Sequence, residues 1–227
     1  LVDRVIKSIA AATEGKSKFN PEGYDVLGLS SNKIRHFLNN LCSERGTVYV
    51  DAGCYMGSTL FAALMGNESV KAYAIDDYQS GIVYPKQRNM HDRFHVENPV
   101  DEMVKNAEKW MNIDCSVGFS VRPIIEVQFN PDQRPNVIFY DADNEDSMAV
   151  NLDHLHEQAD NSYILVVDDA NFNGVVEKTE TFLKDKNVVF ERLIRTEISE
   201  DENDWWNGLY ILVIHKPELF VPKGSNE

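Results

Sequence analysis

Short apolar segments alternate with helical patterns along most of this chain, and most of these segments end in an aspartate. Four segments show this arrangement: 47–51 with Asp51, 70–75 followed by Asp76, 137–140 followed by Asp141, and 163–167 followed by Asp168. They are rich in β-branched and aromatic residues, and amphipathic helix patterns such as 31–41 and 58–65 separate them. Near-continuous apolar strands that alternate with helices predict a parallel sheet covered on both faces.

The last two strand patterns differ from the others. A short strand at 116–121 follows the helix pattern at 101–111, but the segments 188–194 and 209–214 have only an acidic loop between them. With no crossover helix, these two strands should pair as an antiparallel hairpin. The sequence therefore predicts an α/β fold, a doubly wound Rossmann-like sheet that is mostly parallel, with a reversed antiparallel last strand.

We expect one domain over residues 1–227, because no repeat and no Pro/Gly/Ser-rich linker divides the chain. Residues 1–42 would form an N-terminal helical cap. Between 78 and 100 the regular alternation breaks down, and a loop of that length in a compact domain is usually functional. We therefore interpret 78–110 as a candidate lid insertion.

Charge, apolar runs and cysteine spacing limit the classes of partner that this chain is expected to have. The chain has 22 Lys and Arg against 37 Asp and Glu, a formal net charge of −15, which repels phosphate backbones. No apolar run reaches the ~20 residues of a membrane span, and no signal peptide is recognised. The cysteines, Cys42, Cys54 and Cys115, form no paired pattern. We expect a cytoplasmic protein that acts on a small molecule, without nucleic acid or membrane partners, while homo-oligomerisation stays open.

The aspartates would meet at one edge of the predicted sheet, because parallel strands end on the same side. One such aspartate is often only a helix cap or a turn former. Four in succession, with Asp76-Asp77 and Asp168-Asp169 doubled, are harder to explain in that way. Carboxylates gathered at one edge repel one another, so a cationic or donor-rich group should sit among them.

The loop after the first strand, Asp51-Ala-Gly53-Cys-Tyr-Met-Gly57-Ser-Thr59, carries two glycines. Gly53 permits a sharp turn out of the strand, and Gly57 would let a ligand approach the start of the next helix closely. The loop is neither G-x-G-x-x-G nor a Gly-Lys-Ser/Thr phosphate loop, and residues 46–70 contain no Lys or Arg. This pattern favours a ligand without phosphate and disfavours a nicotinamide-dependent dehydrogenase.

These motifs resemble those of the class I S-adenosylmethionine-dependent methyltransferases. In order, VYVDAGCYMGSTLFAA, AYAIDDY, VIFYDADNEDSMAVNLDHL and YILVVDDANFNGV are similar to the small-molecule O-methyltransferases of the catechol and macrolide-sugar (macrocin, mycinamicin) type. The resemblance covers roughly residues 30–215. It implies an S-adenosylmethionine-dependent enzyme that methylates a hydroxyl group of a small metabolite or sugar.

The resemblance also implies roles for individual residues. The cofactor-binding positions would be Asp51, Gly53, Gly57, Asp76, Ser120 and Asp141. Among them, Asp51 would lie near the cofactor's ammonium group, Asp76 would accept both ribose hydroxyls, and Ser120 would contact adenine. Asp141 would also be catalytic, and the metal positions would be Asp141, Asp168 and Asp169, whose oxygen ligands suit Mg²⁺. A metal would lower the pKa of the acceptor hydroxyl and align its oxygen for transfer.

The sequence departs from this family's pattern near Asp141. The run Asp141-Ala-Asp-Asn-Glu-Asp146 lacks the lysine of the catechol enzymes and the histidine of the sugar enzymes. A general base is therefore not identified. The alternative is a catalytically impaired methyltransferase-like domain that binds the cofactor as a sensor or partner subunit.

Other residues admit two interpretations. His154 and His156 lie on different faces of one helix pattern and are best explained as structural. His91 and His95 fall in the 78–100 loop, where they would bind a metal or serve as a proton acceptor or substrate contact. Tyr78, Tyr84 and Phe94 belong to the same loop. Trp205 and Trp206 would pack at the mouth of the last hairpin or line a substrate wall.

Overall fold

A central seven-stranded sheet organises the protein, and a computed structural model describes residues 1–78, 96–111, 116–142 and 145–217. The strands are β1 (Val48–Ala52), β2 (Lys71–Asp76), β3 (Ser116–Val121), β4 (Val137–Tyr140), β5 (Ser162–Val167), β6 (Phe190–Arg195) and β7 (Tyr210–His215). Their order across the sheet is β3-β2-β1-β4-β5-β7-β6. Among the strands of the described residues, β7 alone runs against the others, since it pairs antiparallel with both β5 and β6. The predicted fold class is confirmed, including the terminal hairpin.

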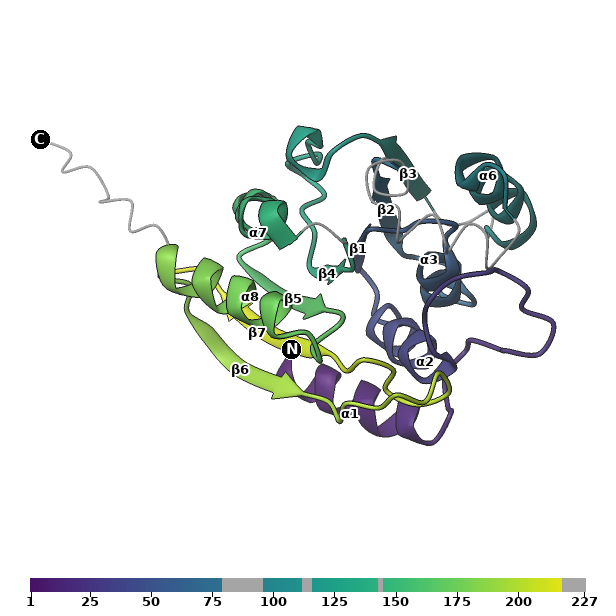
Figure 1. Ribbon diagram of the computed structural model, residues 1–227, viewed down its shortest axis with the longest axis horizontal. Helices are drawn as coiled ribbons and strands as arrows, with labels where there is room; N and C mark the ends of the chain where they lie inside the picture. The colour runs from purple at the N-terminus through teal and green to yellow at the C-terminus, as the bar shows by residue number, and fades with distance from the viewer. Residues whose placement is uncertain (79–95, 112–115, 143–144, 218–227) are drawn as a thin grey trace, which may run out of the picture.

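Helices cover both faces of this sheet (Figure 1). They are α1 (Val2–Thr13), α2 (Asn32–Leu41), α3 (Ser58–Leu64), α6 (Pro99–Trp110), α7 (Glu145–Gln158) and α8 (Asn173–Asp185), with a 3₁₀ turn, η1, at Ile124–Glu126. Helices α1, α2, α3 and α6 pack on one face, and η1, α7 and α8 on the other. Alternate residues of each strand supply the two cores, as a doubly covered sheet requires.

Local chemistry explains where these helices begin. The side chain of Ser31 accepts a hydrogen bond from the Ile34 amide at 3.1 Å and caps α2. Asn98 caps α6 in the same way, and Pro99 stands at its first position, where its missing N–H is not needed. In the described part of the chain, no helix is both long enough and apolar enough to cross a bilayer.

The two cysteines within the described residues, Cys42 and Cys54, are buried, as expected for small apolar core residues. Trp205 is buried as well, and its ring packs edge-on against Phe37 of α2 at 5.9 Å. The packing interpretation of Trp205 is therefore confirmed. Cys115, His91, His95, Tyr84 and Phe94 lie outside the described residues.

Candidate functional site

The carboxyl ends of β1, β2, β4 and β5 bring the sequence-predicted aspartates to one edge of the sheet. Strand register places Asp51 between Ala74 of β2 and Phe139 of β4. Burial is the main cause that raises the pKa values of Asp51 and Asp168, and the carboxylates also interact: the charge of Asp76 raises the pKa of Asp51 further, and the charge of Asp51 raises that of Asp168. The acidic edge predicted from the sequence is therefore present.

Asp51 is the most buried of these acids, with no exposed surface. Its Oδ2 accepts hydrogen bonds from the hydroxyls of Thr59 at 2.8 Å and Tyr49 at 3.2 Å. Its Oδ1 is buried without a hydrogen-bond partner among the described residues. Burial raises the pKa of Asp51 to about 7. A buried carboxylate oxygen without a donor is costly, so this position is suited to a ligand that brings one.

Gly53 holds the loop after β1 against the end of β4. Its φ is +96°, and a Cβ built there would lie 1.9 Å from the Asp141 carbonyl oxygen. Gly57 has φ +85°, and a Cβ there would lie 2.2 Å from the Phe61 ring and 2.8 Å from Met103 Sδ. Both positions require glycine for backbone conformation and for close packing. The contact of Gly57 with the cofactor stays a prediction.

Asp76 ties together two segments that flank the acidic edge. Its Oδ2 accepts the Tyr55 amide at 2.9 Å, and its Oδ1 accepts the Tyr78 amide at 2.8 Å. Both tyrosines have left-handed backbones, with φ of 44° and 54°, and the Tyr78 hydroxyl donates to the Tyr55 carbonyl at 2.8 Å. Each carboxylate oxygen has two acceptor positions, so Asp76 keeps capacity for ligand hydroxyls.

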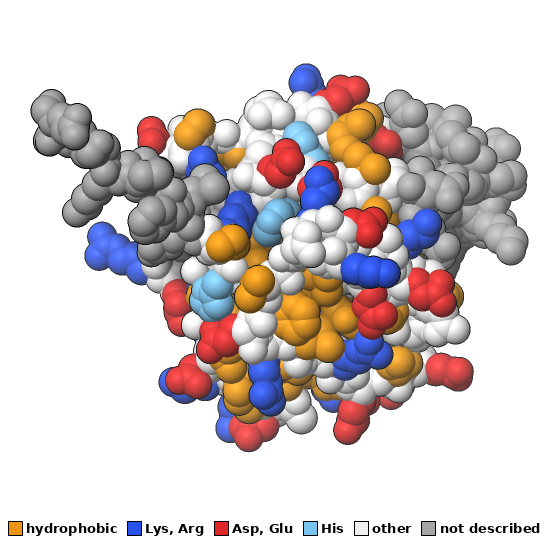
Figure 2. Space-filling model, turned by 90° about the vertical axis from the view of Figure 1, so that its left-hand side faces the viewer, with side chains coloured by type: hydrophobic (Ala, Val, Ile, Leu, Met, Phe, Trp, Pro, Cys, Tyr) orange, Lys and Arg blue, Asp and Glu red, His pale blue; other side chains and the backbone are white. Residues whose placement is uncertain are grey.

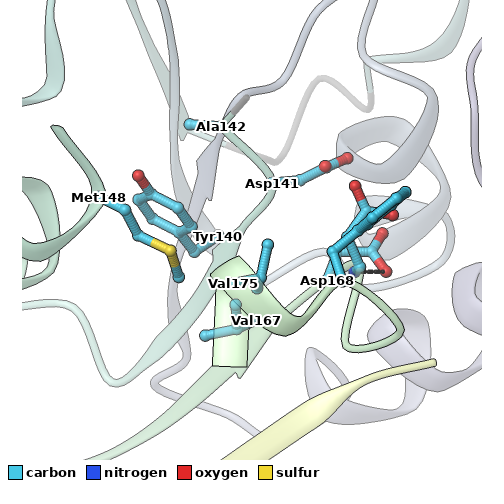
Figure 3. Close-up of a pocket in the computed structure, with 9 residues that line it drawn as sticks. Tyr140, Asp141, Ala142, Met148, Val167, Asp168 and Val175 are labelled. Carbon is cyan, nitrogen blue, oxygen red and sulfur yellow. Dashed lines mark hydrogen bonds between the residues drawn. The ribbon is translucent and has the colours of Figure 1, made fainter. Parts of the chain in front are cut away.

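A cavity of about 230 Å³ lies at the ends of β4 and β5. Figure 3 shows Asp141 and Asp168 on one side of it, with Tyr140 and Met148 on the other. Asp168 and Asp169 both line this cavity, and burial raises the pKa of each, with the charge of Asp169 contributing to the shift of Asp168. All three residues that the sequence analysis assigned to a metal, Asp141, Asp168 and Asp169, therefore line the same cavity.

Hydrogen bonds within the protein orient Asp168 and Asp169. Asp168 Oδ1 accepts the Asp169 amide at 2.9 Å, and Asp169 Oδ1 accepts the Asn207 side-chain amide at 2.7 Å. Over residues 1–78, 96–111, 116–142 and 145–217, no three His, Cys, Asp or Glu side chains converge as metal ligands. The aspartates therefore share a cavity without forming a metal cluster, and the magnesium site stays a prediction.

Ser120 faces a different cavity, of about 320 Å³ and mostly apolar, between α6 and strands β2 and β3. Tyr78, Cys54 and Phe119 also line it. Because Ser120 pairs with Ile75 in the sheet, it lies one residue from the register position of Asp76. This apolar space next to a carboxylate is suited to a flat aromatic ring that carries a hydroxylated sugar.

The histidines of α7 are held by the protein itself. His154 Nε2 lies 2.7 Å from the Val127 carbonyl, and His156 Nδ1 lies 2.7 Å from the Tyr163 hydroxyl. Burial lowers the pKa of His156 to about 4, so this ring is neutral at physiological pH. The structural interpretation of both histidines is confirmed.

Sequence reasoning missed two residues at this edge. Asn207 stands 38 residues after Asp169 in the chain, in a left-handed conformation with φ of 64°, and it comes from the β6–β7 connection. Arg35, on α2, reaches Ser58 directly after the glycine loop. An asparagine beside a glycine, as at Asn207-Gly208, is a turn signal, but nothing in it indicates the partner across the fold.

Comparisons with known proteins identify the fold. No protein-family model matches the chain, and no curated protein matches it in sequence. Similar solved structures include a precorrin-6y C5,15-methyltransferase from Geobacter metallireducens, with a TM-score of 0.58 and 13% identity over 88% of this chain and 100% of that one. An O-methyltransferase from Bacillus cereus in complex with S-adenosylhomocysteine has a TM-score of 0.56 and 13% identity, over 94% and 91% of the two chains.

A third similar structure is magnesium protoporphyrin IX methyltransferase from Synechocystis with bound S-adenosylmethionine. Its TM-score is 0.54 at 14% identity, and the match covers 96% of this chain and 98% of that one. The first and third of these proteins are named for different substrates and the second for none, so the structural similarity does not indicate a substrate for this chain. The chain has the fold of the class I S-adenosylmethionine-dependent methyltransferases.

Proposed function

We propose that this protein is an S-adenosylmethionine-dependent methyltransferase that methylates a hydroxyl group of a small metabolite or sugar. The observation that carries the proposal is the buried Oδ1 of Asp51, which has no hydrogen-bond partner among the described residues and lies at an edge lined with carboxylates. S-Adenosylmethionine has an ammonium group and a sulfonium centre, and both are cations. A cationic ligand offsets the repulsion among the acids and supplies the missing donor.

The described residues fit the rest of this cofactor. Asp51 would accept the ammonium group, and Asp76 would accept the ribose hydroxyls with the acceptor positions that its two backbone bonds leave free. The apolar cavity at Ser120 and Tyr78 would take adenine. When bound, the cofactor would supply an activated methyl group: an acceptor oxygen would attack the methyl carbon in line with the sulfur–carbon bond, and S-adenosylhomocysteine would leave.

The cavity at Asp141 would hold the acceptor. Its acidic side can orient a hydroxyl group and take its proton, and its apolar side can hold a carbon skeleton. Burial raises the pKa of Asp168 and Asp169, which makes these carboxylates stronger bases than exposed ones. We propose Asp141 as the residue that contacts both the acceptor and the cofactor.

The charge distribution supports a small substrate. The net charge of −15 disfavours phosphate polymers, and on the face shown in Figure 2 Lys and Arg are interspersed with Asp and Glu, without a broad basic area. The absence of nucleic-acid and membrane partners, a cytoplasmic location and any homo-oligomer stay predictions.

The first test is calorimetric titration with S-adenosylmethionine and S-adenosylhomocysteine. We expect micromolar dissociation constants for both ligands, because the pocket is already formed and the buried Asp51 carboxylate can accept a hydrogen bond from them. Transfer of a labelled methyl group to a panel of catechols and sugars then tests O-methylation. If neither ligand binds at millimolar concentration, the proposal is wrong.

Magnesium dependence is a separate prediction. The aspartates do not fit a metal site in their described arrangement, so we derive no step through a metal. The donor set nonetheless consists of hard oxygens, and the resemblance assigns Mg²⁺ to it. If Mg²⁺ binds, it should enhance methyl transfer, and Asp141→Asn should abolish that enhancement while the thermal unfolding temperature stays unchanged. Equal turnover in EDTA and in Mg²⁺ would remove the metal from the proposal.

Replacing Asp76 by alanine should weaken cofactor binding by about 1.5–3 kcal/mol, the typical value of a charge-assisted hydrogen bond. Part of this loss would come from the Tyr55 and Tyr78 amides, which the side chain also holds. Asp77→Ala is the matched control, because it removes the adjacent carboxylate and leaves Asp76 with its bonds to the Tyr55 and Tyr78 amides. Titration with S-adenosylhomocysteine measures both variants, and an unchanged dissociation constant for Asp76→Ala would exclude Asp76 from the site.

A cofactor-binding domain without catalysis is the second candidate. The residues lining the Asp141 cavity include no His, Lys or Arg in the described part of the chain, so carboxylates are the strongest proton acceptors there. A sensor or partner subunit would bind S-adenosylmethionine and transfer no methyl group to any acceptor. Binding measured together with the labelled-methyl assay distinguishes the two candidates.

A further inference from the structure

The cavity at the ends of β4 and β5 is charged on one side and apolar on the other (Figure 3). Three of the residues that line it are aspartates, and none of the described lining residues is a Lys, Arg or His. The other lining residues are aliphatic or aromatic, and the exposed ring of Phe172 is one of them. Carboxylates grouped in this way repel one another, so the cavity is complementary to a ligand that carries a positive charge next to an apolar part.

Asp168 is the acid that most needs such a ligand. Only 6% of this residue is exposed, and its Oδ1 accepts the Asp169 amide at 2.9 Å. Its Oδ2 has no hydrogen-bond donor among the described residues. Asp169 is similar, since its Oδ1 accepts the Asn207 amide at 2.7 Å and its Oδ2 has no donor in the same part of the chain. The protein therefore orients both side chains and leaves one oxygen of each to a ligand, because a buried carboxylate oxygen without a donor is costly.

The arrangement of these carboxylates distinguishes two kinds of cation. A divalent metal needs several ligand atoms that converge on one point at about 2.0–2.6 Å. Over residues 1–78, 96–111, 116–142 and 145–217, no three His, Cys, Asp or Glu side chains converge in that way. An ammonium group needs less convergence, because each of its N–H groups donates to a separate oxygen at about 2.8 Å. Aspartates that share a cavity without converging therefore fit an ammonium group better than Mg²⁺.

The cofactor does not supply this ammonium group. In the proposed function its own ammonium lies at Asp51, which does not line the cavity. Its sulfonium centre brings one positive charge toward the acceptor, whereas the cavity holds three carboxylates. The methyl acceptor is then the source of the remaining positive charge.

Phe172 adds an aromatic ring to the same cavity. Its amide donates to the Asp169 carbonyl at 3.0 Å, and its own carbonyl accepts the Val175 amide at 3.1 Å. The turn that carries Asp169 therefore also fixes Phe172 at the start of α8. The residue is 51% exposed, so a ligand in the cavity can reach its ring, and an aromatic face attracts both apolar groups and cations.

We propose that the methyl acceptor is a hydroxylated amine whose ammonium group is bound by Asp168 and Asp169, with Phe172 against its apolar part. This inference rests on the proposed function and narrows its substrate class to acceptors with a basic amine, such as an amino sugar or a phenolic amine. Mg²⁺ is the other cation that these carboxylates attract, and titrations with and without the metal distinguish the two.

The test compares two amines with their N-acetyl derivatives, which keep the hydroxyl groups and carry no charge. Glucosamine, N-acetylglucosamine, tyramine and N-acetyltyramine are titrated into the protein saturated with S-adenosylhomocysteine, first in EDTA and then in Mg²⁺. In EDTA, at least one amine should bind about ten- to hundredfold more tightly than its N-acetyl derivative, the range expected for a charge-assisted hydrogen bond.

Three variants locate the preference for the amine. Asp168→Asn keeps an acceptor for the Asp169 amide and should reduce the preference to about twofold or less. Asp169→Asn should also reduce it, and it keeps the test valid if Asp168→Asn does not fold, because asparagine tolerates the left-handed φ of 59° at this position. Asp132→Asn, at an exposed position, is the control and should leave the preference unchanged. Unchanged affinity for S-adenosylhomocysteine shows that a variant is folded.

The contrary outcomes are distinct from one another. Equal affinities within both pairs, or no binding of either amine at millimolar concentration, would contradict the inference and leave the proposed function standing. A preference that survives in both Asp168→Asn and Asp169→Asn would show that the ammonium group lies elsewhere. If Mg²⁺ binds and the amines do not, the cation of this cavity is the metal and the inference is wrong. Failure of the wild-type protein to bind S-adenosylhomocysteine would contradict the proposed function itself.

Discussion

Replacing Asp51 by asparagine is expected to weaken cofactor binding strongly and, at pH 8, to make the protein more stable. Burial raises the pKa of Asp51 from 3.8 to about 7, which corresponds to about 4 kcal/mol of unfavourable free energy for the ionised form. Asparagine carries no charge, keeps an acceptor for Thr59 and Tyr49, and leaves its NH₂ without a partner at a cost of about 1–3 kcal/mol. The net expectation is a gain of about 1–3 kcal/mol in unfolding free energy.

Urea unfolding and titration with S-adenosylhomocysteine measure the two effects of Asp51→Asn separately. The affinity should fall at least about hundredfold, because a buried charged hydrogen bond is lost and an amide NH₂ faces the ligand's ammonium group. Asp132→Asn, at an exposed position, is the control and should alter neither quantity. An Asp51→Asn protein that binds as tightly as wild type would remove Asp51 from the cofactor site.

The pH dependence has a defined sign. Between about pH 4 and 7 the folded protein holds a proton on Asp51 that the unfolded chain has released, so this group's contribution to stability falls as the pH rises through that window. Ligand binding has the opposite dependence, because the ionised carboxylate receives the ammonium group. Unfolding free energy and affinity are therefore measured against pH for wild type and Asp51→Asn. The difference between the two proteins gives the contribution of Asp51 apart from the other acids of the edge.

Gly53→Ala is the second change with a large expected effect. A methyl group at this position would lie 1.9 Å from the Asp141 carbonyl oxygen, so the loop after β1 or the end of β4 must move. We expect a loss of more than about 3 kcal/mol in unfolding free energy, combining overpacking with the strain of a positive φ. Failure of the variant to fold at 37 °C would agree with this expectation.

Gly46→Ala separates the two contributions to that loss. Gly46 also has a positive φ, +84°, but a Cβ there meets nothing within 4 Å. This control should lose only about 1–2 kcal/mol, the typical cost of a left-handed conformation for an L-residue. Urea unfolding measures the unfolding free energy of both variants. Equal losses would show that the close approach to Asp141 is not the reason why residue 53 must be glycine.

Much of the fold could be predicted because its signals are local. Each strand before an aspartate is an apolar run, and the absence of a crossover helix before β7 indicated the antiparallel hairpin. The acidic edge followed from strand direction alone. The contacts of Arg35 with Ser58 and of Asn207 with Asp169 could not be predicted, because each joins residues that are distant in the chain and set by tertiary packing.

The apolar cavity at Ser120 was also beyond prediction. Its walls come from β2, β3 and α6, and its volume depends on how α6 packs, which no spacing in the sequence encodes. The Tyr55 and Tyr78 amides that hold Asp76 depend on two left-handed tyrosines, a conformation that side-chain type does not indicate. Backbone geometry of this kind is visible only in the folded protein.

The hydrogen bond from Asn207 to Asp169 has a consequence for synthesis of the chain on the ribosome. β1, which carries Asp51, is complete by residue 52, yet the residue that orients Asp169 is translated about 150 residues later. Lys33 of α2 and Asp204 form an ion pair that joins α2 to the same β6–β7 connection. A nascent chain whose residue 207 has not yet left the ribosome therefore has an incomplete acidic edge. The pocket is complete only after that residue has been translated and released.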